Sequence, residues 1–189
     1  MAKANTHKSI PALRDISTTD AKGLKFELKN VNQPYVLVSF LRYAGCPFCN
    51  LSIHRLVMEQ DLLKQSRCDI VAFVQSTAEN IEKNIYTRHI VKPDFPIIPD
   101  QKMKFYKQFG IKPSYKTTKK MIEDIPHWVH AVRHHGFKQG TVDGSLFIAP
   151  ALFLVHIPTM KIIHADYASN LFEHETFSPI YQKILTHSQ

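Results

Sequence analysis

Two cysteines, Cys46 and Cys49, are the residues of this chain best placed to do redox chemistry. A short apolar run, Val36 to Leu41, precedes them and is long enough for one buried strand. Apolar residues at helical spacing follow from Ile53 onward. Pro47 suits the first position of that helix, because its missing N–H has no intrahelical partner there. The sequence therefore predicts that Cys46 lies at or beside a helix N-cap, where a buried strand turns into a helix.

This position predicts the chemistry of the pair. Unpaired N–H groups at a helix start favour negative charge, so we expect the pKa of Cys46 to lie below that of a free thiol. Cys49 lies one turn later on the same face, where a disulfide can close. We expect an exposed Cys46 to attack and a shielded Cys49 to resolve the mixed disulfide. The pair has two alternative interpretations: one half of a structural zinc site, or two buried cysteines paired by chance. A zinc site would need a second pair of ligands, and Cys68 stands alone.

Three stretches carry a family resemblance. The stretch Phe40–Cys49, FLRYAGCPFC, resembles the active-site stretch of the peroxiredoxin-like branch of the thioredoxin-like superfamily, the alkyl hydroperoxide reductase/thiol-specific antioxidant type. Phe95–Asp100 and the apolar run that Pro150 opens are similar to later stretches of the same group. The resemblance implies an antioxidant oxidoreductase with an α/β, three-layer fold, in which a central mixed sheet has helices on both faces.

The resemblance also implies roles for residues around the thiols. Pro150 is expected to be a cis-proline that faces Cys46 and aligns the backbone of a partner. Arg42 is expected either to lie beside the thiol and favour the thiolate, or to leave the sheet as an edge charge. Tyr43 either offers its hydroxyl to the site or packs on the helix, and Pro47 and Phe48 complete the active-site support.

One departure from the family pattern affects the predicted function. Typical peroxiredoxins carry Pro-x-x-x-Thr-x-x-Cys at the attacking cysteine, whereas this chain has Ser39 and Tyr43 at the first two of these positions. The sequence therefore favours a thiol–disulfide oxidoreductase that reacts slowly with peroxide. A thiol peroxidase is the alternative, and a thioredoxin-fold binding protein that recruits a partner through a lysine-rich insert is the second alternative.

The composition is that of one globular domain. The chain has 189 residues, of which 44% are hydrophobic and 21% charged. We expect a flexible arm over residues 1–20, a domain over residues 21–189 and a helical insert over residues about 111–144. No apolar run is long enough to span a membrane and no secretory signal is evident. Three cysteines, two of them paired in CxxC, favour a reducing compartment, so we expect a cytoplasmic protein.

Charge and histidine content suggest further binding sites. The net charge is +8. The stretch Gln101–Met121 has no acidic residue and seven lysines: Lys102, Lys104, Lys107, Lys112, Lys116, Lys119 and Lys120. It is either a solvated face or a surface for an acidic partner, while nucleic acid is not expected without a binding motif. The spacing of His127, His130 and His134 places them on one helix face. This face is either a metal site or part of the protein surface. We expect no metal or organic cofactor, and electrons from thioredoxin, glutaredoxin or glutathione.

Periodicity and turn residues predict the elements. The expected strands are Tyr35–Leu41, Ile70–Val74, Phe95–Ile98, Ala151–His156 and Lys161–Ala165. The expected helices are Pro47–Gln65, a helix opened by a Ser76/Glu79 capping box, a short helix after Asp100, a helix starting at Thr117 or Thr118, and Phe172–Thr186.

Overall fold

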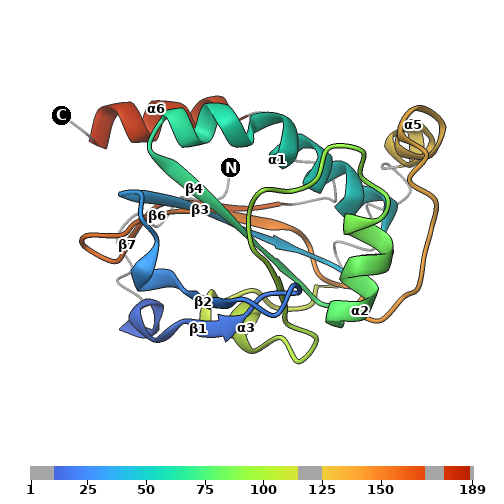
Figure 1. Ribbon diagram of the computed structural model, residues 1–189, viewed down its shortest axis with the longest axis horizontal. Coiled ribbons are helices and arrows are strands. Elements are labelled where there is room, and N and C mark those ends of the chain that lie inside the picture. The colour runs from blue at the N-terminus through green and yellow to red at the C-terminus, as the bar shows by residue number, and fades with distance from the viewer. Residues whose placement is uncertain (1–10, 115–124, 169–176, 188–189) are drawn as a thin grey trace.

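The computed structural model describes residues 11–114, 125–168 and 177–187, and its centre is a five-stranded sheet of order β5-β4-β3-β6-β7 (Figure 1). The strands are β3 (Tyr35–Leu41), β4 (Cys68–Val74), β5 (Ile97–Pro99), β6 (Ala151–His156) and β7 (Lys161–Tyr167). β3, β4 and β5 run parallel, whereas β6 and β7 pair antiparallel with their neighbours. The sheet is therefore mixed, as predicted.

Elements cover both faces of this sheet (Figure 1). One face carries α1 (Pro47–Gln65) and α6 (Ser178–His187). The other carries η1 (Pro11–Asp15), the hairpin of β1 (Ser17–Thr19) and β2 (Lys25–Glu27), η2 (Leu28–Asn30) and α3 (Lys104–Gln108). After β4 the chain forms α2 (Ala78–Ile81) and the π-helical η3 (Glu82–Tyr86), and α5 (Ile125–His135) packs against α1. These layers confirm the predicted thioredoxin-like arrangement.

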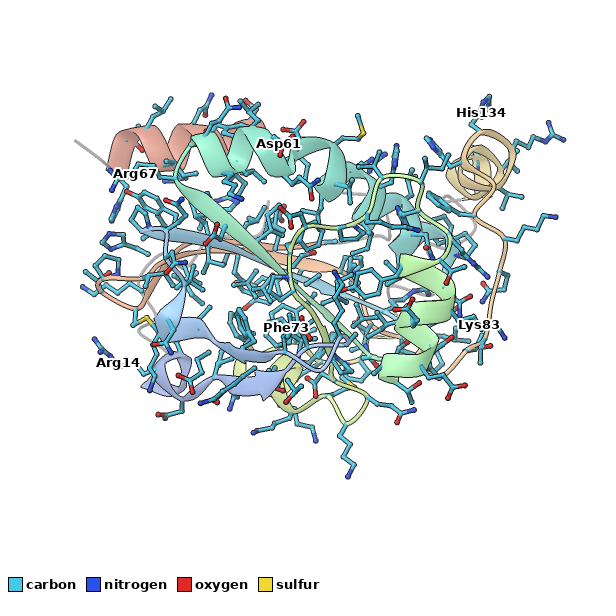
Figure 2. All side chains as sticks on the ribbon, in the orientation of Figure 1. Arg14, Asp61, Arg67, Phe73, Lys83 and His134 are labelled. Carbon is cyan, nitrogen blue, oxygen red and sulfur yellow. The ribbon has the colours of Figure 1, made fainter. Side chains whose placement is uncertain are left out.

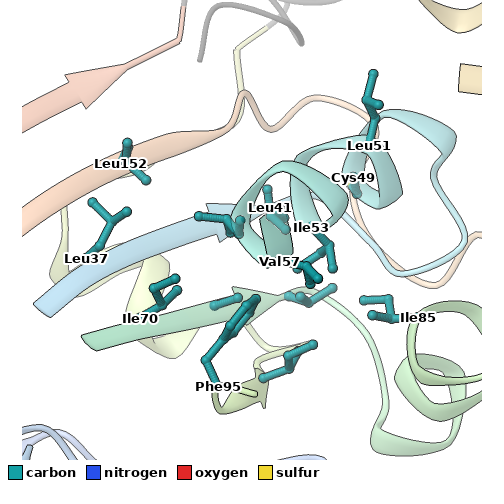
Figure 3. Close-up of a cluster of buried hydrophobic side chains, with 14 of the residues drawn as sticks. Leu37, Leu41, Cys49, Leu51, Ile53, Val57, Ile70, Ile85, Phe95 and Leu152 are labelled. Carbon is teal, nitrogen blue, oxygen red and sulfur yellow. The ribbon is translucent and has the colours of Figure 1, made fainter. Parts of the chain in front are cut away.

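The central strand β3 is buried along its whole length, which explains its unbroken apolar sequence. Leu37 and Leu41 face the cluster under α1, whereas Val36, Val38 and Phe40 face the cluster on the opposite side. Figure 3 shows the first cluster, in which side chains of α1 meet those of the strands. Two clusters, one on each face, hold the sheet rigid beneath the start of α1.

Tyr106 of α3 fixes the strand ends near that helix start. Its hydroxyl donates a hydrogen bond to the carbonyl oxygen of Phe73 at 2.8 Å and also contacts the carbonyl oxygen of Leu41. Asp100 holds α3 itself, because its carboxylate accepts hydrogen bonds from the backbone N–H groups of Lys104 and Phe105. Phe73 lies in the interior, while Figure 2 places charged side chains such as Lys83 on the outside.

The loose arm predicted over residues 1–20 is wrong for residues 11–20. Leu13 and Ile16 are buried in the cluster beneath the sheet, and Ser17–Thr19 pairs with β2. These apolar side chains cover the sheet face that α1 leaves open, so the segment is part of the core. Residues 1–10 lie outside the described part.

Other boundaries differ locally from the prediction. Thr77, rather than Ser76, caps α2, since its side chain accepts a hydrogen bond from the N–H of Asn80. The described part of the closing helix begins at Ser178, and residues 169–176 of the predicted span lie outside the described part. The predicted helix start at Thr117 or Thr118 also lies outside it. In the described residues, no helix is long and apolar enough to cross a bilayer.

Candidate active site

Cys46 occupies the position that the sequence predicts. β3 ends at Leu41, a short loop follows, and Cys46 is the N-cap of α1 with Pro47 in its first turn. Gly45 makes the close approach that this loop requires, because a Cβ there would lie 2.3 Å from the carbonyl oxygen of Thr141. The loop between strand and helix therefore presses against a segment far away in the sequence.

The Arg42 guanidinium lies beside the thiol of Cys46. Arg42 Nη2 donates a hydrogen bond to Cys46 Sγ at 3.0 Å, so Arg42 is not an edge charge. Burial by itself raises the pKa of Cys46, but the hydrogen bond from Cys49 and the charge and hydrogen bond of Arg42 outweigh it and lower the pKa to about 6. A thiol with this pKa is mostly thiolate at neutral pH.

Cys49 has the opposite character. Burial, followed by its hydrogen bond to Cys46 and the Cys46 charge, raises its pKa well above the ordinary value. Its side chain belongs to the buried cluster under α1 (Figure 3). The structure contains both cysteines as free thiols, so the pair is one thiolate beside one protonated thiol.

The prediction that Cys46 is exposed is wrong, because the side chain is 0% exposed. Residues 137–146, here called the strap, lie against the Cys46 loop. The N–H of Gly140 donates to the carbonyl of Gly45 at 2.7 Å, Tyr43 Oη donates to Gln139 Oε1 at 3.4 Å, and Arg42 Nη1 donates to the carbonyl of Leu146 at 3.1 Å. The strap falls mainly within the segment predicted as an insert, and these hydrogen bonds hold it against the loop that carries the buried thiol.

Hydrogen bonds to the two residues that precede α2 anchor the strap at its centre. Asp143 Oδ1 accepts from Ser76 Oγ at 2.6 Å, and its Oδ2 accepts from the N–H of Thr77 at 3.0 Å. Ser76 Oγ in turn accepts from the N–H of Ala44 at 2.8 Å. Ser76 therefore links the strap to the Cys46 loop, a role that the predicted capping box did not reveal.

Asn50 and His89 hold the same loop from the other side. Asn50 Nδ2 donates to the carbonyls of Ala44 and Cys46 at 2.7 and 3.0 Å. His89 Nε2 lies 3.2 Å from Asn50 Oδ1, which can only accept, so this nitrogen carries the proton. Burial lowers the pKa of His89 to about 4, so the ring is neutral at physiological pH. Sequence reasoning missed both residues, because no motif connects them.

Three other predicted site residues lie close to the thiols. Tyr43 is buried, and burial raises its pKa to about 12, but its hydroxyl bonds to the strap rather than to Cys46. Pro47 begins α1, and Phe48 is buried in the cluster beneath it. These residues shape the site, whereas Arg42 supplies its charge.

The predicted cis-proline is wrong. Among the described residues no peptide bond is cis, so the Ala149–Pro150 bond is trans. The carbonyl of Pro150 accepts a hydrogen bond from the N–H of Ala168 at 3.0 Å, which extends the pairing of β6 and β7 by one residue. Pro150 thus directly precedes β6 and accepts one hydrogen bond from the residue after β7.

The predicted charge and histidine clusters are only partly described. Lys102, Lys104, Lys107 and Lys112 are exposed, whereas Lys116, Lys119 and Lys120 lie outside the described residues. His134 is exposed on α5 (Figure 2), and the side chains of His127 and His130 are not among those described. In the described part of the chain, no three His, Cys, Asp or Glu side chains are grouped to hold a metal ion. Cys68 is buried, and burial raises its pKa to about 12.

A mixed five-stranded sheet with Cys46 at the start of α1 is the arrangement of a thioredoxin-like thiol oxidoreductase. The sequence profile of the AhpC/TSA family matches residues 11–156. The chain therefore belongs to the AhpC/TSA family, and the predicted resemblance is confirmed. Comparison with curated proteins finds no significant sequence relative.

Solved peroxiredoxin structures share the fold. A cysteine-to-serine mutant of Xylella fastidiosa PrxQ is 12% identical with a TM-score of 0.67, covering 100% of this chain and 98% of its own. Peroxidoxin BcpB from Mycobacterium tuberculosis is 13% identical with a TM-score of 0.63, covering 90% of this chain and 92% of its own. A thiol peroxidase from Chromobacterium violaceum is 10% identical with a TM-score of 0.60, covering 92% and 84%. At these identities the likeness concerns the fold.

Proposed function

We propose that this protein is a thiol peroxidase that reduces small hydroperoxides, with Cys46 as the attacking thiolate and Cys49 as the resolving thiol. The observation that carries the proposal is the enclosed Cys46 Sγ with Arg42 Nη2 at 3.0 Å. The sequence analysis favoured a thiol–disulfide oxidoreductase and gave the thiol peroxidase as the first alternative. We now prefer the peroxidase, because AhpC/TSA membership and the buried thiol both favour it.

The burial of Cys46 argues for a small oxidant. A protein disulfide must bring a sulfur atom and its backbone to Cys46 Sγ, which is 0% exposed beneath the strap. A hydroperoxide presents two bonded oxygen atoms and needs far less space. A hydroperoxide therefore needs a smaller movement of the strap than a protein substrate, which requires the strap to leave Gly45 and Tyr43.

The charges argue for fast attack. The Arg42 guanidinium keeps Cys46 as thiolate, and a fixed positive charge beside the sulfur also stabilises the negative charge that develops as the O–O bond breaks. The sequence predicted slow peroxide chemistry because Tyr43 replaces a threonine. Arg42 is the group that we propose as its working replacement.

The second thiol completes the cycle. Peroxide oxidises Cys46 to the sulfenic acid, and the thiol of Cys49 then attacks that sulfur, releasing water and forming the Cys46–Cys49 disulfide. Two electrons from a thiol reductant return the pair to the dithiol; thioredoxin, glutaredoxin and glutathione are the expected sources. The cytoplasmic location and the acidic partner of the lysine-rich stretch stay predictions.

Rapid mixing tests the proposal. Reduced full-length protein is mixed with hydrogen peroxide, quenched in acid and weighed by intact-mass spectrometry. We expect loss of two hydrogens in the wild type, gain of one oxygen in Cys49→Ser, and no fast reaction in Cys46→Ser. Cys68→Ser is the matched control and should behave as wild type, since that thiol lies outside the site. A wild-type rate no higher than that of free cysteine would contradict the proposal.

Thiol–disulfide exchange is the second candidate, and the hydrogen bond between Cys49 and Cys46 favours it, because it places the resolving thiol ready for a mixed disulfide. The same rapid-mixing experiment with oxidised glutathione and with a small protein disulfide decides between the two. If either disulfide oxidises Cys46 faster than hydrogen peroxide at equal concentration, the oxidoreductase assignment takes first place.

A further inference from the structure

Gln75 lies beside Arg42 at the same edge of the sheet. Arg42 directly follows β3 and Gln75 directly follows β4, and the ends of these strands, Leu41 and Val74, are paired in parallel register. The N–H of Gln75 donates to the carbonyl of Arg42 at 2.8 Å. Both side chains are buried, with exposures of 1% and 2%. The pairing of β3 and β4 thus places an amide next to the guanidinium that contacts Cys46.

Each of these side chains has one hydrogen-bond donor that is not used. Among the described residues, neither Gln75 Nε2 nor Arg42 Nε has a hydrogen-bond partner, although both atoms are buried. Burying an unpaired donor is unfavourable, and native proteins contain few such groups. Two of them on adjacent backbone-paired residues indicate a site that an oxygen-bearing ligand completes.

The strap fixes the orientation of both side chains. The N–H of Ser145 donates to Gln75 Oε1 at 3.1 Å, so the oxygen of the amide is held and its NH₂ group is the free end. The neighbouring carbonyl of Leu146 accepts from Arg42 Nη1 at 3.1 Å, which leaves Nη2 for Cys46 and Nε unpaired. Gly144 permits this contact, because a Cβ there would lie 2.9 Å from Gln75 Cβ.

Gln75 also lies in the electrostatic neighbourhood of the thiols. Burial raises the pKa of Tyr106, and the charge of Cys49 and the amide of Gln75 both act on the same hydroxyl. The charge of Cys49 raises this pKa and the Gln75 side chain lowers it, so the Gln75 amide faces the Tyr106 hydroxyl, although the contact falls outside strict hydrogen-bond geometry. Tyr43 cannot serve as the donor here, since its hydroxyl donates to Gln139.

We propose that Gln75 is a peroxide-binding residue of this site, whose Nε2 together with Arg42 Nε donates hydrogen bonds to the oxygens of the hydroperoxide. This inference rests on the proposed peroxidase function and adds its second donor. Cys46 Sγ attacks one peroxide oxygen, so that an S–O bond forms as the O–O bond breaks. Cys46 loses two electrons to the peroxide, and the departing oxygen takes up a proton to leave as water or an alcohol. Gln75 and Arg42 stabilise the negative charge on that oxygen.

The variant Gln75→Met tests this role, because methionine keeps the shape of the side chain and removes the donor. We expect the rate of Cys46 oxidation by hydrogen peroxide to fall by about 10²-fold, as is typical when one preorganised donor is lost. Alkylation of Cys46 by iodoacetamide is the second readout, since it needs the thiolate and access but no bound peroxide. Its rate and its pH midpoint should match those of the wild type, because the variant leaves the thiolate character of Cys46 and access to it intact.

Gln108→Met is the matched control, the same substitution in a partly buried glutamine of α3 that lies outside the pair. Its peroxide and alkylation rates should equal those of the wild type. An unchanged peroxide rate in Gln75→Met overturns the inference, and so does an equal fall in the peroxide and alkylation rates, which would indicate a structural role. If the wild type itself reacts no faster than free cysteine, the proposed function fails and this inference fails with it. A fast wild type with an equally fast Gln75→Met removes the inference alone.

Discussion

Arg42 Nη2 and Cys46 Sγ lie 3.0 Å apart in the protein interior, where both residues are almost completely shielded from solvent. Neither group is stable there without the other, because an isolated buried charge of either sign carries a large desolvation cost. The thiolate raises the pKa of Arg42 against the opposing effect of burial, and the guanidinium lowers that of Cys46. The reactive state of the sulfur therefore depends on a residue only four positions away in the sequence.

Replacing Arg42 should weaken the thiolate character of Cys46. In Arg42→Met we expect the pKa of Cys46 to rise above its wild-type value of about 6, since the charge and the hydrogen bond of Arg42 are lost while the hydrogen bond from Cys49 remains. The rate of iodoacetamide alkylation, measured between pH 5 and 9, reports the midpoint. Arg42→Lys keeps the charge and should give an intermediate midpoint. A midpoint that stays near that of the wild type in Arg42→Met would show that the thiolate is sustained without Arg42, by the hydrogen bond from Cys49 and the helix start.

Cys49 should tune Cys46 through its hydrogen bond. Among the groups that lower the pKa of Cys46, the side chain of Cys49 is the largest. Cys49→Ala removes the donor and should raise the pKa, whereas Cys49→Ser keeps a hydroxyl donor and should raise it less. Ultraviolet thiolate absorbance across pH distinguishes the two variants, with the Cys68→Ser background removing the third thiol. Equal midpoints in the serine and alanine variants would count against this hydrogen bond.

Acid should destabilise the protein through His89. The folded-state pKa lies near 4, below the unfolded value of 6.5, so between these values the unfolded chain binds a proton that the folded chain does not. The free energy of unfolding should thus decrease by about 1–3 kcal/mol as pH falls from 6.5 toward 4. His89→Gln keeps a donor for Asn50 and should lose less stability over this range. Chemical denaturation at pH 7 and 4.5 measures the difference, and parallel losses in both proteins would exclude His89 as the source.

Close contact at Gly45 should control access to the thiol. In Gly45→Ala the new Cβ meets the backbone of Gly140 and Thr141 at 2.7 and 2.3 Å, so the strap must shift. We expect a stability loss of about 1–3 kcal/mol and faster reaction of Cys46 with a bulky aromatic disulfide reagent. Gly136→Ala adds the same methyl group where nothing lies within 4 Å, and its φ of +68° adds only local strain. If that control opens the site equally, the Gly45 contact is not the barrier.

Local patterns predicted most of the fold. The bounds of β3 and α1 follow from an apolar run and from Pro47, and both match the structure. The placement of Cys46 at the helix start follows as well, because it depends on neighbours in the chain. The buried segment at Leu13 and Ile16 was missed, since its short apolar pattern resembles that of a loose terminus.

Contacts between distant residues could not be predicted in this way. The strap meets the Cys46 loop through backbone groups and glycines, and the spacing of Gly140 and Gly144 indicates only a loop. Asn50 and His89 are 39 positions apart and share no motif. The predictions of an exposed Cys46 and of a cis Pro150 were wrong for the same reason. Each of these properties depends on which remote segment packs against the site.

The contact between Arg42 and the carbonyl of Leu146 joins residues 104 positions apart. A chain emerging from the ribosome has made Cys46 and Arg42 long before it makes Leu146, so the carbonyl that holds the guanidinium arrives only with the last third of the protein. We therefore expect the thiol to acquire its full reactivity toward oxidants only when folding is complete.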